Sequence, residues 1–101
     1  MINKRFEKIL SPIKIGNMVL KNRIVSTPCY GVEVKAKGGA ALVIEGSVNV
    51  DCEKSFWDKN TNYSFSKYEL AKRKQQVNNA HFYGAKIGAE LFHAGMWCRV
   101  P

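Results

Sequence analysis

The chain has 101 residues, of which 46% are hydrophobic and 24% are charged. This composition is globular and excludes a largely disordered chain, and the length suffices for one small domain but not for two. The formal net charge of +8 raises the possibility of nucleic-acid binding. However, the basic residues are spread from Lys4 to Arg99, and the densest run, 72–74, lies in a helical pattern whose solvated face explains it. We therefore expect no nucleic-acid partner.

Membrane spans and secretion signals are also not expected. The longest apolar stretch, 40–44, is far shorter than the roughly 20 residues of a membrane span. Charged residues interrupt the segment 1–10, which lacks the ~7 to 15 apolar residues of a signal-peptide core. The three cysteines (Cys29, Cys52 and Cys98) are odd in number and widely separated, so they predict reduced thiols rather than disulfides or a metal site. These features predict a cytoplasmic protein.

The first predicted elements are a hairpin and a short strand. In 13–20, Ile13 and Ile15 alternate with Lys14, Gly16-Asn17 supplies a turn and the apolar residues 18–20 return, which is typical of a β-hairpin. The β-branched run 24–27 follows and is stopped by Pro28, which cannot donate to a continuing ladder. It is the first candidate for a buried strand.

The next strand is predicted from a continuous apolar run. Residues 40–44 lack alternation, as expected for a parallel strand covered on both faces, and we expect the strand to end at Glu45-Gly46. The segment 51–63 is polar, aromatic and aperiodic, which predicts a long loop.

A helix and a third strand complete the pattern. Ser66 and Glu69 form a capping box, so a helix is predicted to start there, with Gly84 as its left-handed terminator. The residues expected on its apolar face are Leu70, Val77, Ala80 and His81. The histidine is therefore expected to be a core group, and 86–92 is the third strand.

The element order indicates βα units and a parallel sheet. Three strands with one long helix leave two open edges and one uncovered face, which is a poor self-sufficient fold. The connection 29–39 is at the lower limit for a crossover. Its possible helix, 32–37, spans only roughly 9 Å, about half the ~17 Å of a typical strand.

Several segments resemble a known family. Residues 10–17 (LSPIKIGN) and 20–25 (LKNRIV) are similar to the opening of the old yellow enzyme family. The segment 36–46 is similar to its second strand, and 84–95 to its third. The resemblance is strongest to the branch of NADH:flavin oxidoreductases that includes dienoyl-CoA and 2-enoate reductases.

This resemblance implies an α/β fold, a (β/α)₈ TIM barrel with FMN across the C-terminal ends of its strands. It implies NAD(P)H as reductant and hydride transfer from reduced flavin to an activated alkene, with a small enoate or enoyl-CoA as substrate. An iron-sulfur cluster in the parent enzyme would lie outside this chain.

The resemblance also implies five cofactor-binding residues. Pro28 and Cys29 match the end of the first strand, whose backbone lines the flavin face. Tyr30 occupies the position where many members place Cys or Thr near the reactive flavin nitrogen. Gly46 matches a small residue that avoids the ring, and Glu90 stands where many members use Gln on the pyrimidine edge. A carboxylate can only accept hydrogen bonds there, whereas an amide also donates.

Two further residues are not assigned catalytic roles. His93 resembles the histidine of a His-Ala-Gly-Arg sequence, but Met96 replaces the arginine, and we expect a structural histidine. Glu45 is expected to be a hydrogen-bonded strand end rather than a general acid. No catalytic residue and no metal ligand is therefore predicted.

A barrel of this type needs about 250 residues. Residues 1–101 are thus predicted to be one partial FMN-binding barrel domain: an N-terminal hairpin and about three βα units, with an internal deletion around 30–37 that shortens the first crossover. The chain alone is expected to be at best partly folded, to retain no flavin through purification and to be inactive. Two alternatives stay open, a small basic nucleic-acid-binding protein and an assembly module that pairs its open sheet edges with another chain or with itself.

Overall fold

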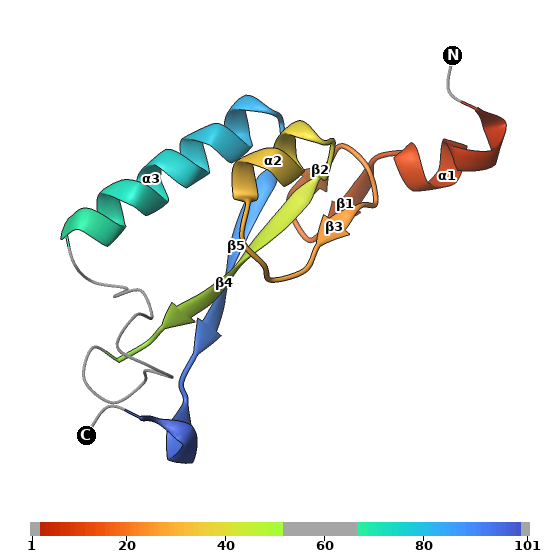
Figure 1. The fold of residues 1–101 in the computed structure, drawn as a ribbon. Helices are drawn as coiled ribbons and strands as arrows, with labels where there is room; N and C mark the ends of the chain where they lie inside the picture. Colours follow the sequence, from red (N-terminus) through yellow and green to blue (C-terminus); the bar gives the residue numbers. More distant parts are fainter. Residues whose placement is uncertain (1–2, 52–66, 100–101) are drawn as a thin grey trace.

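The fold is built around a three-stranded parallel sheet with helices on one side (Figure 1). The computed structural model describes residues 3–51 and 67–99. In chain order its elements are η1 (Lys4–Phe6), α1 (Glu7–Leu10), β1 (Ile13–Ile15), β2 (Met18–Leu20), β3 (Val25–Ser26), α2 (Val32–Lys37), β4 (Leu42–Asn49), α3 (Lys67–Phe82), β5 (Lys86–Phe92) and η2 (Gly95–Trp97). The short helices η1, α1 and η2 were not predicted from the sequence.

The predicted hairpin is confirmed. Strands β1 and β2 pair antiparallel, and Gly16 takes the positive φ of 57° that the tight turn requires. Leu20 is only 1% exposed. Lys21 Nζ donates to the Tyr83 carbonyl at 2.6 Å, which ties the hairpin to the turn between α3 and β5.

The parallel sheet is also confirmed, in the order β3-β4-β5. The predicted end of the second strand at Glu45-Gly46 is wrong, because β4 continues to Asn49. After a register shift beyond Glu45, Val48 pairs with Leu91 and Asn49 with Phe92. Ladder pairing with the long strand β5 therefore extends β4 beyond its apolar run.

The short first crossover contains α2, which occupies the range 32–37 expected for it. Helices α2 and α3 lie on the same side of the sheet (Figure 1). Between them and the sheet lies a small core. Its buried members are Val32, Ala36, Ala40, Val43, Ala80 and Ala85. Four of the six are alanines, so each removes little apolar surface from water.

The face that helix α3 presents to the sheet overlaps only partly with the one predicted. Leu70 is 54% exposed and His81 is exposed as well, so their assignment to the apolar face and the expectation of a core histidine are wrong. Ala80 is buried, as predicted, and Glu69, which was not predicted on this face, is buried as well. The amino-terminal half of α3 faces a carboxylate on β4, so polar side chains point toward the sheet in that half of the helix. Ser66 and nearly all of the predicted loop 51–63 lie outside the described residues.

The other face of the sheet has no helix over it within residues 3–51 and 67–99 (Figure 1). Val25 is 46% exposed on β3. On β5, a Cβ on Gly88 would lie 3.0 Å from Ile44 Cδ1 on the neighbouring strand β4. None of the described helices is long and apolar enough to cross a membrane.

Candidate functional site

Three of the five predicted site residues meet where the three parallel strands approach their carboxyl ends. A Cβ built on Gly46 would lie 2.5 Å from Pro28 Cβ and 3.3 Å from Pro28 Cα, and 3.1 Å from Glu90 Oε1. The pyrrolidine ring cannot move aside as a flexible side chain does. Gly46 is therefore required by the chain's own packing, whether or not a ligand is bound.

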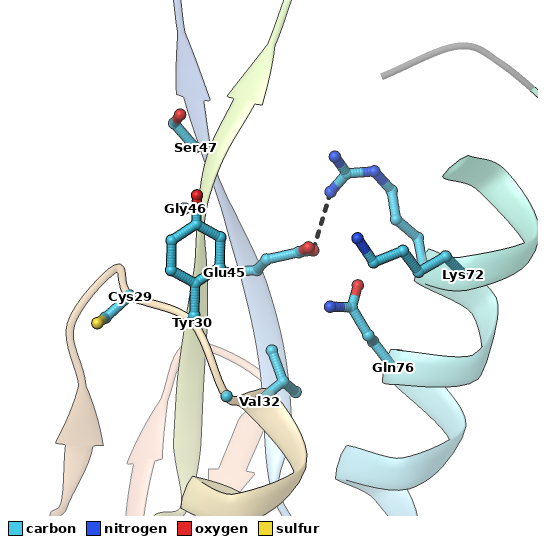
Figure 2. A pocket seen from close by; sticks show the side chains of 10 residues that line it. Cys29, Tyr30, Val32, Glu45, Gly46, Ser47, Lys72 and Gln76 are labelled. Carbon is cyan, nitrogen blue, oxygen red and sulfur yellow. Dashed lines mark hydrogen bonds and ion pairs between the residues drawn. The ribbon is translucent and has the colours of Figure 1, made fainter. Parts of the chain in front are cut away.

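The remaining two predicted residues lie on the connection between β3 and α2. Cys29 is an exposed thiol, and the Tyr30 side chain is 84% exposed. Both line a cavity beside Gly46. In Figure 2 the Cys29 sulfur points away from Lys72 and Gln76 on α3. The structure thus places all five residues at one end of the sheet, but only Pro28, Gly46 and Glu90 are in close contact.

Glu45 has a different environment from its neighbour Gly46, because successive residues of a strand face opposite sides of a sheet. Its Oε2 accepts a hydrogen bond from Arg73 Nη1 at 2.9 Å, and the side chains of Arg73 and Glu45 are 17% and 19% exposed. The expectation that Glu45 is hydrogen-bonded is confirmed. The interpretation of 72–74 as a solvated run is wrong for Arg73, which crosses to the sheet.

The cavity of about 100 Å³ lies between this ion pair, the start of α2 and the side chains of α3. Lys72 and Gln76 point across it toward the strand that carries Glu45 (Figure 2). Arg73 Nε and Gln76 Oε1 are buried and have no hydrogen-bond partner in the described part of the chain. Sequence reasoning missed this cavity. The only signal was the polar spacing of Glu69, Arg73 and Gln76 along the helix.

His93 has a local structural role, as expected. Its Nδ1 accepts a hydrogen bond from the Gly95 backbone N–H at 2.9 Å, at the start of η2. Across residues 3–51 and 67–99, no three His, Cys, Asp or Glu side chains gather closely enough to hold a metal ion.

A parallel βα sheet with small and polar residues at its carboxyl ends is the arrangement that α/β barrel enzymes use for their sites. No family model matches the sequence. The chain is 30% identical over 110 residues to N,N-dimethylglycine/sarcosine dehydrogenase from Chromohalobacter salexigens, covering 89% of this chain and 15% of that protein. It is 29% identical over 118 residues to NADPH dehydrogenase from Listeria monocytogenes, covering 93% of this chain and 32% of that protein.

Solved structures share the fold. The old yellow enzyme from Trypanosoma cruzi superposes with a TM-score of 0.78 at 21% identity, over 93% of this chain and 29% of that one. A 2-naphthoyl-CoA reductase in complex with 2-naphthoyl-CoA gives a TM-score of 0.79 at 19% identity, over 93% of this chain and 17% of that one. The predicted resemblance to the old yellow enzyme family is confirmed, and the related proteins are oxidoreductases.

The chain spans between about a seventh and a third of the length of these relatives. The described residues form no closed barrel. An α/β fold that corresponds to part of a TIM barrel is therefore established, while the number of barrel units stays a prediction.

The residues at the strand ends fit one edge of an FMN ring. Because Gly46 has no side chain, only its backbone lies beside Pro28. The Glu90 carboxylate lies next to this backbone and offers Oε1 as a hydrogen-bond acceptor. A flavin ring presents an N–H on its pyrimidine edge, which a carboxylate can accept.

Proposed function

We propose that this chain forms the flavin-facing N-terminal part of an FMN-dependent NAD(P)H oxidoreductase that reduces activated alkenes. The observation that carries the proposal is the convergence of Pro28, Gly46 and Glu90 toward the carboxyl ends of three adjacent parallel strands. The fold shared with old yellow enzyme supports it.

In this proposal each residue has a defined part. The backbone at Pro28, Cys29 and Gly46 lines one face of the ring, and Tyr30 lies beside it. Glu90 accepts a hydrogen bond from the ring N–H. When bound, FMN supplies the hydride chemistry between NAD(P)H and the substrate.

The substrate class is proposed as a small enoate or an enoyl-CoA thioester. Support comes from the resemblance of the sequence to the branch with dienoyl-CoA and 2-enoate reductases. The fold shared with the reductase solved with 2-naphthoyl-CoA also supports it. An iron-sulfur cluster would belong to other parts of such an enzyme. The cytoplasmic location and the lack of a nucleic-acid partner stay predictions from the sequence.

We further propose that the chain alone is inactive and loses FMN during purification. Its five proposed site residues line or bind the ring, and none of them is assigned a role in proton transfer. The small alanine-rich core also favours a marginally stable sheet.

The test is a titration of the purified chain with FMN, followed by the backbone amide signals of residues 46 and 90. We expect weak, saturable shifts at these amides, retained in Glu90→Gln and lost in Glu90→Leu, because an amide can still accept from the ring N–H. Glu7→Leu, at an exposed site on α1, is the control and should leave the shifts intact. Shifts that are the same whichever residue occupies position 90 would contradict the proposed flavin site.

Inactivity is tested separately. We expect the chain to add nothing to the rate at which free FMN passes electrons from NADH or NADPH to an α,β-unsaturated ketone. A chain-dependent, saturable rate would show that inactivity was the wrong expectation.

A second candidate function is an assembly module. The outer edges of β3 and β5 are unpaired among the described residues, and purely parallel sheets normally have both faces covered. Sedimentation at increasing concentration tests this candidate, which requires a defined oligomer rather than open-ended aggregation.

A further inference from the structure

We propose that the cavity between α2, α3 and β4 binds a small oxyanion, such as phosphate or a small carboxylate. Figure 2 shows the side chains concerned, with Lys72 and Gln76 from α3 facing Glu45 on β4. The cavity shares Cys29, Tyr30 and Gly46 with the proposed flavin site, but its charged side chains do not belong to that site, because Glu45 and Gly46 face opposite sides of the strand.

The cavity arises from the short crossover between β3 and β4. Helix α2 has 6 residues, whereas α3 has 16, so α2 cannot follow α3 along its whole length. Where α2 packs, the inward side of α3 is apolar at Ala80. One to two turns earlier, Arg73 and Gln76 replace the apolar residues and line the cavity. The space beside the start of α2 is thus bordered by polar groups.

The charges in the cavity favour an anion. Lys72 and Arg73 contribute two positive charges, and Glu45 contributes one negative charge. The Glu45 carboxylate is already engaged by Arg73 Nη1 at 2.9 Å, which fixes the guanidinium in place. One positive charge is therefore left without a counter-charge in the lining.

The unused hydrogen-bonding groups also favour an oxyanion. Arg73 Nε is buried and lacks a partner within the described residues, and leaving such a donor unsatisfied costs about 1–3 kcal/mol. Gln76 Oε1 is buried without a partner as well. Rotation of the Gln76 amide would present its two N–H donors instead. Ser47 is also among the residues that line the cavity.

The volume limits the size of the ligand. A cavity of about 100 Å³ corresponds to about three water molecules at ~30 Å³ each. A volume of this size suits an oxyanion of four or five heavy atoms.

The experiment titrates the full chain with inorganic phosphate and, separately, with acetate, at an ionic strength held constant with NaCl. Binding is followed by calorimetry and by the amide signals of residues 47 and 72–76. We expect saturation in the millimolar range. Tighter binding of phosphate would assign the site to phosphate, and equal or tighter binding of acetate would assign it to carboxylates.

Two charge-matched variants locate the site. Lys72→Gln removes a cation of the cavity, whereas Lys74→Gln makes the same change at an exposed position of α3 outside the lining. We expect at least fivefold weaker binding for Lys72→Gln and a change below twofold for Lys74→Gln. Equal weakening by both variants, or no saturation with either anion, would overturn the proposal.

A third variant separates loss of binding from loss of structure. Gln76→Glu keeps the size of the side chain but places a carboxylate in the cavity, so binding should disappear while the helical circular dichroism signal stays. Binding that survives this change would also overturn the proposal.

Discussion

The two ends of the interface between α3 and the sheet differ in chemistry. At the amino ends of β4 and β5, Val43, Ala80 and Ala85 form a closely packed apolar contact. Toward the amino end of the same helix and the carboxyl end of β4, Arg73 bonds to Glu45 beside a cavity. The difference shows that packing holds the amino ends of the strands, while the carboxyl ends carry groups available for chemistry.

The largest effect is expected at the carboxyl end, for Gly46→Ala. The added Cβ would meet Pro28 Cβ at 2.5 Å, and relieving such overpacking costs about 3 kcal/mol. Amide hydrogen exchange in β4 and β5 measures the loss in the free energy of opening. Pro28→Gly removes the opposing Cβ, so Gly46→Ala should cost much less in that background. Equal costs in both backgrounds would show that Pro28 does not require the glycine.

The next effect is expected in the apolar contact, for Val43→Ala. Val43 is fully buried, and deleting its two methyl groups should lower the free energy of opening by about 2 kcal/mol. Val34→Ala is the matched control, because Val34 is 75% exposed on α2. Its cost should stay below about 0.5 kcal/mol. Similar costs at the two positions would mean that the core is not packed as described.

A smaller effect is expected for Arg73→Leu, about 1 kcal/mol, because it leaves the mostly buried Glu45 carboxylate without its partner. The double variant Glu45→Leu with Arg73→Leu should recover most of this loss, since apolar replacement of a buried ion pair is often neutral. A double-mutant cycle on hydrogen-exchange free energies gives the coupling. Zero coupling would indicate that the ion pair contributes nothing to the stability of the contact between α3 and the carboxyl end of β4.

The smallest effects are expected for Leu70→Ala and His81→Ala. Both side chains are exposed on α3, so each change should shift the free energy of opening by less than about 0.5 kcal/mol. A cost above 1 kcal/mol at either position would favour the helix face predicted from the sequence over the one in the structure.

Much of the fold was predictable from local patterns. The hairpin follows from alternation around Gly16-Asn17, and the ranges 32–37 and 86–92 were anticipated as a helix and a strand. The helix face was not predictable, because hydrophobicity placed Leu70 inward, whereas α3 turns Arg73 inward toward Glu45. The end of β4 was missed for a related reason. Its last residues are strand because β5 pairs with them, not because they are apolar.

The candidate site divides in the same way. The resemblance selected Pro28, Gly46 and Glu90 before any contact between them was visible. The cavity was not predicted, because Lys72 and Gln76 have no motif that links them to lining residues 25 or more positions earlier in the chain.

The sequence by itself determined the class of this protein: an α/β chain with parallel βα units and the motifs of old yellow enzyme. These properties depend on local periodicity, turn chemistry and short ordered segments, each of which involves only residues that are close together in the sequence. Only the tertiary structure decided which side of α3 is buried, why Gly46 must lack a side chain, and where a cavity opens. Each of these depends on contacts between distant residues, and such contacts follow from how the elements pack rather than from any one of them.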